Sequence, residues 1–261
     1  MERVTPKVFL IGETKVHEPG LQDYLDHIGV PNYQSDAPSD PEKLIEIMGR
    51  LCYKSFIPKL NPNVSKIREH NAEYIQNIIR VKHGSVIEHP MLNFIFADVS
   101  RVFTHELVRH RPGVAISQES LRFVRLDELK QWLPNVIHES PEAVEIFSRT
   151  FEELERLQLS LAEMFELDEP GRKFAYKKVV TSAMRRLAPM GLATNIGWSA
   201  NMRTIRWLLE ARTHPSAEEE IRLVFGKVGE IVLERYPNLF ADFQVDVIDG
   251  HPQFIPEASK V

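Results

Sequence analysis

The chain has 261 residues, a formal net charge of −5, 43% apolar residues and 26% charged residues, as expected for a globular protein with a sizeable core. The acidic balance argues against general nucleic-acid binding, and no apolar run approaches the roughly 20 residues that span a bilayer. The single cysteine, Cys52, excludes an intramolecular disulfide and a zinc site made of several cysteines. We therefore expect a cytoplasmic protein with neither a nucleic acid nor a membrane as its partner.

Apolar periodicity in the first half of the chain predicts both strands and helices. In chain order they are a strand over Val8–Gly12, helices over 39–55 and near Ser65–Val81, a strand over Met91–Ser100 and a helix over Ser100–Arg111. Ser39 or Asp40 is the expected cap of the first helix, with Pro41 in its first turn. The apolar stripe of this helix is Leu44, Ile45, Met48, Leu51 and Cys52. On that placement Cys52 is predicted to be a small buried hydrophobe and not a nucleophile.

The second half of the chain is richer in helical patterns. In chain order it predicts a strand over Ser120–Leu126, a long amphipathic helix over Ser140–Leu167, a basic helical segment over 172–188, a strand over Gly191–Ala200 and helices over Asn201–Arg212 and Ser216–Tyr236. Ser216 and Glu219 match the S-x-x-E capping box of the last helix. This mixed order predicts an α/β (α+β) fold in a single domain over 1–261, with a helical subregion at about 140–187.

Familiar catalytic motifs are largely missing from the sequence. In HELVRH, His105 and His110 are five residues apart, which is about 500° around a helix, so they do not share a face as the histidines of a zinc HExxH motif do. Neither a GxSxG elbow, a Walker loop nor GxGxxG occurs. We therefore expect no metal site and no common hydrolase or nucleotide-loop chemistry.

Cations cluster in the segment Thr104–Phe123. It contains Arg109, His110, Arg111 and Arg122 beside a Pro-Gly turn and the sequence SQESLR. Arginine forks bind phosphate in a bidentate manner, and serine hydroxyls or loop N–H groups complete such sites. The alternative is that these cations only stabilise the C-terminus of a helix. From the residues alone, a ligand that carries phosphate and a purely structural role both stay open.

The segment RHRPGVAISQESLR resembles the signature of the flavin-dependent thymidylate synthases, which is RHR, seven residues and then S-x-R. Other blocks are similar to family segments in the family's order, and together they cover about Gly49 to Val245: GRLCYKS, VKHGSVIEHPMLNFIFADVSRVFTHELVRHR, NMRTIRWLLEARTHPSAEEEIR and FADFQV. The resemblance implies the family's fold, a mixed sheet with long helices. It also implies a homotetramer with its active sites between subunits.

The resemblance further implies an activity, the reductive methylation of dUMP to dTMP. Methylenetetrahydrofolate would supply the carbon, and NADPH would supply electrons through FAD. Because the flavin supplies hydride in this family, no protein nucleophile is needed, and the protein provides orientation and charge stabilisation. Two alternatives stay open, a flavin-dependent hydroxymethylase-like paralogue that acts on a pyrimidine nucleotide and a non-catalytic binder of phosphorylated ligands.

Site residues follow from the resemblance, position by position. The expected FAD contacts are His83, Ser85, Arg109, His110, Arg111, Gln118, Asn201, Met202 and Arg203. The expected dUMP contacts are Glu106, Arg109, Gln118, Glu119, Ser120, Leu121, Arg122, Arg185 and Arg212. Among these, Arg212 is the expected catalytic residue, because a guanidinium at the pyrimidine edge would stabilise an anionic ring. Arg186 competes with Arg185, and each position has a structural alternative as a loop cap, a solvated helix face or a helix-terminal cation.

The sequence departs from the family's pattern at two places near the expected ligands. Eight residues, Pro112 to Glu119, separate Arg111 from Ser120 where the family has seven. The family also has a flavin-contacting histidine four residues after the arginine that matches Arg212, and here Ser216 takes that place, with His214 displaced. A Pro-Gly turn can absorb one extra residue. Ser216 is expected to act as a helix cap and not as a ligand contact.

Overall fold

The computed structural model describes residues 2–64, 66–126, 128–259 and 261. The chain folds into two compact units and passes between them several times. Unit 1 comprises Met1–Phe9, Ile95–His110 and Ile116–Gly197, and unit 2 comprises Leu10–Phe94, Arg111–Ala115 and Trp198–Val261. Helices and strands occur in mixed order along the chain, which confirms the predicted α/β class.

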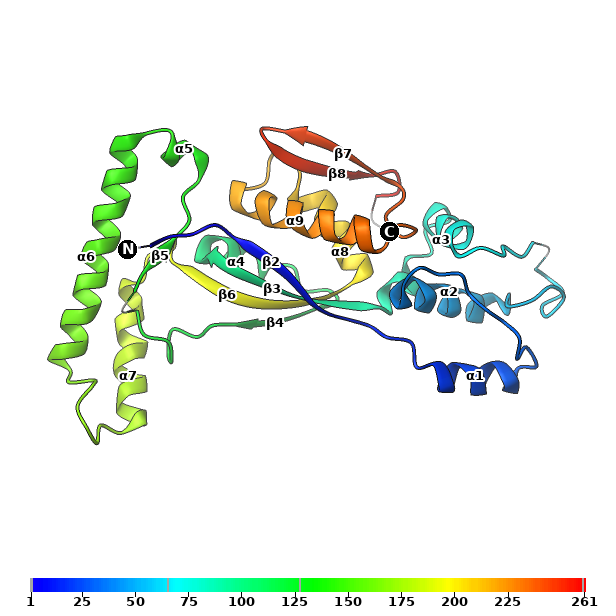
Figure 1. The fold of residues 1–261 in the computed structure, drawn as a ribbon, viewed down its shortest axis with the longest axis horizontal. Helices are drawn as coiled ribbons and strands as arrows, with labels where there is room; N and C mark the ends of the chain where they lie inside the picture. The colour runs from blue at the N-terminus through cyan, green and yellow to red at the C-terminus, as the bar shows by residue number, and fades with distance from the viewer. Residues whose placement is uncertain (1, 65, 127, 260) are drawn as a thin grey trace. The chain divides into compact units, whose positions relative to one another are not determined.

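The largest sheet among the described residues has four strands in the order β2-β3-β6-β4 (Figure 1). Its strands are β2 (Lys7–Glu13), β3 (Met91–Ser100), β6 (Ala193–Asn201) and β4 (Val114–Gln118). Each of these strands has some of its residues in unit 1 and the others in unit 2. Along β3 and β6 buried side chains alternate with partly exposed ones, the pattern of strands with one face in a core. The three strands predicted over Val8–Gly12, Met91–Ser100 and Gly191–Ala200 are thereby confirmed.

The strand predicted over Ser120–Leu126 is wrong. Residues 121–123 form a turn, and β4 ends before it, at Gln118. The Ser120 carbonyl accepts hydrogen bonds from the N–H groups of Phe123 and Val124, and its hydroxyl accepts one from the Arg122 N–H. Local bonds of this kind compete with a strand ladder. The alternation in the sequence reflects instead a turn whose Leu121 enters a core cluster.

Unit 1 is mainly helical beyond its part of the sheet. Its other elements are β1 (Glu2–Arg3), α4 (Arg101–Leu107), β5 (Lys130–Gln131), α5 (Asn135–His138), α6 (Pro141–Met164), α7 (Phe174–Met184) and η2 (Arg185–Leu187). Ser140 caps α6 by accepting from the Ala143 N–H, so the predicted long helix is confirmed. Helices α6 and α7 lie side by side (Figure 1), joined by a hydrogen bond from Gln158 Nε2 to the Met184 carbonyl. The basic segment predicted to be helical is α7 with η2.

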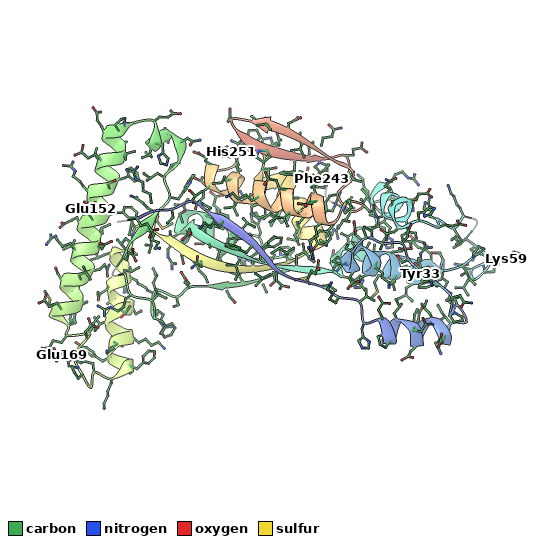
Figure 2. All side chains as sticks on the ribbon, in the orientation of Figure 1. Tyr33, Lys59, Glu152, Glu169, Phe243 and His251 are labelled. Carbon is green, nitrogen blue, oxygen red and sulfur yellow. The ribbon has the colours of Figure 1, made fainter. Side chains whose placement is uncertain are left out.

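Unit 2 contains the other helices and a C-terminal hairpin. These elements are α1 (Glu18–His27), α2 (Asp40–Tyr53), α3 (Asn71–Arg80), η1 (Gly84–Glu88), α8 (Met202–Arg212), α9 (Glu219–Arg235), β7 (Phe243–Ile248) and β8 (His251–Pro256). The antiparallel β7–β8 pair turns at Asp249 and Gly250, both at positive φ, as a tight hairpin turn requires. The Arg206 guanidinium lies over the ring of Phe243, which is labelled in Figure 2, and Arg206 Cζ is 4.8 Å from the centroid of that ring.

Helix α2 confirms the predicted helix and its Ser39 cap, which accepts from the Glu42 N–H, but its predicted apolar stripe is only partly right. Cys52 is exposed and not buried as expected, and Leu51 is 45% exposed. The buried face carries Glu42, Glu46 and Arg50, all at most 2% exposed. These side chains are buried because each has polar partners, which a count of apolar residues cannot register.

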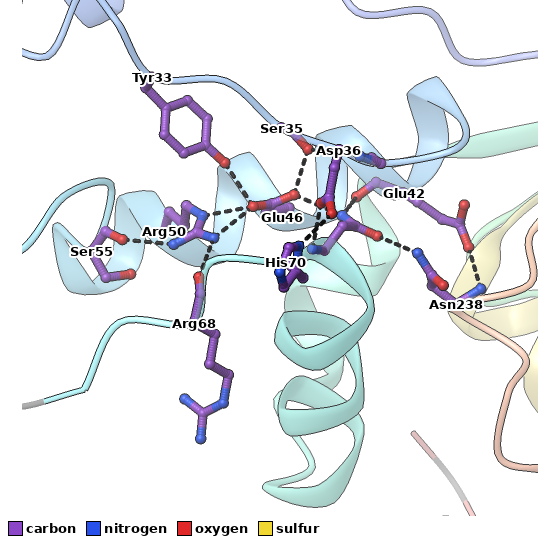
Figure 3. A network of polar contacts seen from close by, with 12 residues as sticks. Tyr33, Ser35, Asp36, Glu42, Glu46, Arg50, Ser55, Arg68, His70 and Asn238 are labelled. Atoms are coloured by element: carbon purple, nitrogen blue, oxygen red, sulfur yellow. Dashed lines mark hydrogen bonds and ion pairs between the residues drawn. The ribbon is translucent and has the colours of Figure 1, made fainter.

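The partners of this buried face form a polar network (Figure 3). Glu46 accepts from the Tyr33 hydroxyl, the Ser35 hydroxyl and Asn71 Nδ2, and it pairs with Arg50 at 2.7 Å. Asp36 accepts from the Asn71 N–H, which begins α3 at Asn71. The predicted start of this helix near Ser65 is therefore wrong for residues 66–70, and Ser65 itself lies outside the described residues.

Candidate active site

The cationic triplet lies beyond the end of a helix. Ser100 caps α4 as predicted, but the helix ends at Leu107 and not near Arg111. The N–H groups of Arg109 and His110 donate to carbonyls of the last turn. Arg109 and Arg111 are exposed, whereas His110 is 8% exposed. Since the triplet is not helical, its side chains are freed from helical spacing.

The longer Pro-Gly turn is fixed within unit 2 against the start of α8. The Gly113 carbonyl accepts from the Asn201 N–H at 2.9 Å, and Thr204 Oγ1 donates to the Pro112 carbonyl at 2.8 Å. Gly113 has a φ of 68°, and a Cβ there would overlap the Asn201 amide, so only glycine fits. The Asn201 side chain itself caps α8 by accepting from the Thr204 N–H. The extra residue is thus absorbed in a defined turn.

The expected FAD contacts of unit 2 surround the 3-10 helix η1. The Arg203 guanidinium lies over Gly84, where a Cβ would come within 2.8 Å of Nε, and Arg203 Nη1 pairs with Glu88 at 2.5 Å. His83 precedes η1, and its buried Nδ1 has no hydrogen-bond partner among the residues described. Ser85 is exposed. A buried polar atom without a partner is costly and fits a site that awaits a polar ligand.

These segments, far apart in the sequence, line one cavity of about 360 Å³ in unit 2. Its lining residues are Glu88, Pro112, Gly113, Asn201, Arg203, Thr204 and Trp207. Met202, also expected at FAD, has its side chain fully buried in the core, and its N–H donates to the Pro90 carbonyl. The Arg203 guanidinium in this lining suits the phosphates of a flavin dinucleotide. The His83 imidazole and the Ser85 hydroxyl do not line the cavity, but they lie at the start of η1, whose last residue, Glu88, does, and they suit ring heteroatoms. The residues present therefore fit the group.

The expected nucleotide contacts of unit 1 follow β4. Gln118 Nε2 donates to Thr104 Oγ1 at 3.2 Å. The Glu119 carboxylate accepts from Asn195 Nδ2 at 2.7 Å, from the Asn195 N–H and from the Thr194 hydroxyl. Glu119 therefore fixes the loop to β6 with its side chain. Glu106, one helical turn before His110, is half-buried on α4.

The arginines expected at the nucleotide phosphate lie on the surface of unit 1. Arg122 is exposed after the Ser120 turn. Arg185, at the start of η2, lines a small cavity together with Leu121, the buried residue of that turn. Arg186 donates to the Ser182 carbonyl near the end of α7, which favours Arg185 over Arg186 as the ligand-facing arginine.

Sequence reasoning missed a further cation, Arg101. Burial and then the like charge of Arg185 lower the pKa of Arg101. Its Nη2 donates to the Glu119 carbonyl at 3.4 Å, and its buried Nε has no partner among the described residues. Two guanidiniums that repel each other in this way would be stabilised by a bound anion. The sequence offered only a weak signal, an arginine directly after a strand and a helix cap.

Arg212 is the last residue of α8, and the hairpin fixes that end of the helix. Thr213 Oγ1 donates to the Leu209 carbonyl and accepts from the Phe254 N–H of β8. Arg212 is half-buried, and its side chain is not free of partners. A guanidinium on a helix end held in this way has a restricted range of positions, which charge stabilisation in a transition state requires.

The predicted capping role of Ser216 is wrong. His214 Nδ1 accepts from the Ser216 N–H at 3.2 Å and contacts its hydroxyl at 2.8 Å. Helix α9 begins at Glu219, and the Glu218 carboxylate caps it by accepting from the N–H groups of Glu220 and Ile221. A carboxylate is favoured there because it also interacts with the positive end of the helix dipole. His214 and Ser216 instead form a closed local turn.

Among the described residues, no group of three or more His, Cys, Asp or Glu side chains is arranged to hold a metal ion. The helices in the described part of the chain also lack the length and apolarity needed to cross a membrane.

Comparison with known proteins adds to this geometry. A family model described as "thymidylate synthase complementing protein" matches residues 35–238. A flavin-dependent thymidylate synthase from Corynebacterium diphtheriae is 34% identical over 226 residues, which is 85% of this chain and 87% of the relative. One from Corynebacterium aurimucosum is 30% identical over 246 residues, covering 93% of both chains.

Two solved structures have a similar fold. The UMP/dUMP methylase PolB from Streptomyces cacaoi, bound with 5-Br UMP, has a TM-score of 0.61 at 14% identity and covers 92% of this chain and 94% of its own. Thymidylate synthase X from Helicobacter pylori, with FAD and dUMP, has a TM-score of 0.58 at 19% identity and covers 91% and 98%. At these identities the likeness concerns the fold.

Proposed function

The chain belongs to the flavin-dependent thymidylate synthase family, a family of methyltransferases, and from this premise we propose its reaction and the residues that carry it. The reaction is the reductive methylation of dUMP to dTMP, with methylenetetrahydrofolate as carbon donor and NADPH as reductant. The observation that carries the proposal is the cavity in unit 2, where Pro112–Gly113, Asn201 and Arg203 meet beside η1.

The FAD contacts we propose are charged and hydrogen-bonding side chains. Arg203, positioned by Glu88, and the exposed Ser85 would bind the cofactor, while His83 offers its Nδ1 atom, which lacks a partner among the described residues. Arg109, His110 and Arg111 complete the set, with Gln118 as a further contact. Once reduced by NADPH, bound FAD would supply hydride to the pyrimidine ring, so a protein nucleophile is not required.

The nucleotide contacts we propose belong to the cationic surface of unit 1. Arg122, Arg185 and Arg101 would bind the phosphate of dUMP together with the Ser120 hydroxyl, because convergent guanidiniums bind phosphate strongly. Glu119 positions this loop through its bonds to β6. Glu106 and the backbone of Leu121 are further candidates for contact.

The chemical step depends on one guanidinium. We assign Arg212 to the pyrimidine edge, where its positive charge would stabilise electron density that builds up in the ring. The hairpin contacts through Thr213 keep the end of α8 in place for this task.

The assembly we propose is the family's homotetramer, working in the cytoplasm. Large apolar side chains are exposed on β2 and on α6 and α7, including Ile11 at 62%, Met164 at 71% and Val179 at 68%. Exposed apolar surface of this kind is typical of protein interfaces. Light scattering after size-exclusion chromatography would show a mass four times that of the chain.

The function is tested with purified protein. We expect a flavin absorbance spectrum, recovered by added FAD if the cofactor is lost. The holoenzyme should then convert dUMP to dTMP, identified by mass, only when methylenetetrahydrofolate and NADPH are both present. A hydroxymethylated product would support the alternative reaction. Protein that binds no FAD, and that fails to support growth of thymidine-requiring cells, would refute the proposal.

A further inference from the structure

A second basic pocket, of about 170 Å³, lies on unit 1 between the Ser120 turn and α7. Its charged and aromatic lining consists of Arg122, Phe123, Arg125, Asp168, Phe174, Lys177 and Lys178. Of these residues only Arg122 belongs to the set expected at the nucleotide phosphate. The pocket is therefore adjacent to that set but built mainly from other side chains.

Helix α7 places Phe174, Lys177 and Lys178 in the lining of this pocket. Lys177 and Lys178 are half-buried, whereas Val179, which does not line the pocket, is 68% exposed. A basic helix face that serves only solubility shows the reverse pattern, with its lysines in solvent. The orientation thus holds ammonium groups at the pocket.

The positive charge in the pocket is not neutralised. Arg125 pairs with Asp168. Among the residues that the structure describes, Arg122, Lys177 and Lys178 have no carboxylate partner. Lys178 Nζ lies 5.1 Å and Arg122 Cζ 5.9 Å from the centroid of the Phe123 ring. A bound anion would neutralise positive charge that the protein itself leaves without a counter-ion.

An aromatic surface adjoins these cations. The rings of Phe123 and Phe174 are parallel within 1°, with centroids 6.1 Å apart, and both residues are more than half exposed. Parallel offset rings are a surface onto which a further planar ring can stack. The pocket therefore offers binding for a negative charge and for a ring close to it.

We propose that this pocket is an anion subsite for a co-substrate that carries negative charge next to an aromatic ring. The inference rests on the proposed function, whose co-substrates include two groups of this chemistry. One is the glutamate tail on the benzoyl ring of the folate, and the other is the 2′-phosphate beside the adenine of NADPH. Lys177 and Lys178 bind the anionic group, and the phenylalanine pair contacts the ring.

The test uses the FAD-loaded enzyme with the double substitution Lys177→Gln and Lys178→Gln. Equilibrium dialysis would measure four probes in two pairs, folinic acid against pteroic acid, which lacks glutamate, and NADP⁺ against NAD⁺. Loss of charge-assisted bonds should weaken binding of the member of one pair that carries the extra anionic group, the glutamate or the 2′-phosphate, at least about tenfold. The member of that pair that lacks this group should bind the variant and the wild type equally. Whichever pair responds identifies the co-substrate.

Matched controls separate this effect from misfolding and from the nucleotide site. Lys173→Gln removes a cation from the exposed cap of α7, outside the pocket, and should change none of the four affinities. Lys178→Arg keeps the charge and should restore much of the binding. If the double variant bound all four probes as tightly as the wild type does, the inference would be overturned. It would also be overturned if the double variant bound only dUMP more weakly. Failure of the proposed function is seen separately, as wild-type protein that binds no FAD.

Discussion

Charged side chains cluster in two regions of the molecule, and the two clusters differ in burial and in whether the charges have partners. In the α2–α3 region of unit 2, Arg50 is 2% exposed and donates to Glu46 and to the carbonyls of Ser55 and Arg68 (Figure 3). On the surface of unit 1, Arg122, Lys177 and Lys178 have no carboxylate partner among the described residues. Each buried charge in the first region is satisfied, while charges in the second are exposed or half-buried.

This difference separates charges that serve folding from charges that serve a ligand. A buried charge must have partners, because an unpaired one would cost several kcal/mol. Cations kept together without partners gain nothing for stability and repel each other. Their clustering beside a serine turn in unit 1 is therefore best explained by an anionic ligand. The same contrast predicts opposite outcomes for arginine substitutions in the two regions.

The largest effect is expected from Arg50→Ala. It leaves Glu46 buried without its cation and should lower the free energy of unfolding by about 3–5 kcal/mol. Urea denaturation followed by circular dichroism measures this change. Arg156→Ala is the matched control, because its pair with Glu153 is exposed and should matter by no more than about 1 kcal/mol. Similar losses in the two variants would contradict the assignment of Arg50 to a buried structural network.

Arg212→Ala should have the next largest effect, on the rate. Removing a group that stabilises transition-state charge should lower kcat by about 100- to 1,000-fold. FAD absorbance and the unfolding midpoint should stay close to wild type. Arg212→Lys keeps the charge without the planar fork and should recover part of the rate. Turnover unchanged in the alanine variant would rule out the role at the pyrimidine edge.

Arg122→Ala should weaken dUMP binding without destabilising the fold. Losing one charge-assisted contact to phosphate should raise the Kd for dUMP by about 10- to 100-fold. Because Arg122 is exposed and near like charges, the unfolding midpoint should be unchanged or slightly higher. Arg186→Ala, which removes an exposed arginine bonded to the Ser182 carbonyl of α7, should leave the Kd for dUMP as it is. A drop in stability with unaltered dUMP affinity would place Arg122 among the structural charges.

Local patterns in the sequence predicted much of the fold. Helices begin where expected after Ser39, Ser100 and Ser140, each of which caps its helix, because side-chain caps depend on near neighbours. The turn at Asp249–Gly250 carried a recognised hairpin signal, and β7 and β8 could have been found from it. The prediction of which side chains of α2 are buried was partly wrong. Glu46 and Arg50 are buried because they have hydrogen-bond partners on other segments of the chain.

The candidate site shows the same division between local and distant information. From the residues alone, the cluster around Arg109 and Arg122 left an anionic ligand and a structural role both open, and the resemblance supplied the proposed roles. Arg101 was missed because its importance comes from Arg185, which lies far away in the sequence. The prediction that Ser216 caps the last helix was wrong because Ser216 is hydrogen-bonded to His214 and Glu218 caps the helix instead. The spacing of a motif predicts which residues could cap a helix, but it does not show whether a neighbouring side chain already forms hydrogen bonds with them.

The smallest effect, and the one that depends on pH, concerns Glu13 in unit 2. Hydrogen bonds from Arg235, at 2.7 and 3.0 Å, lower the pKa of Glu13 from 4.5 to about 2, and the Tyr236 hydroxyl bond contributes to this shift. A carboxyl with a depressed folded pKa adds stability above its unfolded pKa and loses it as the pH falls. The contribution should therefore be complete above pH 4.5 and decline toward pH 2.

Glu13→Gln should remove that dependence. The variant should be less stable than wild type at neutral pH, and the two unfolding midpoints should converge as the pH is lowered from 4.5 toward 2. Since Arg235 is 52% exposed, the difference should also shrink in high salt. Glu153→Gln, on the exposed pair with Arg156, should show a weaker version of the same trend. A constant gap between Glu13→Gln and wild type across this range would mean that Glu13 contributes through packing and not through its charge.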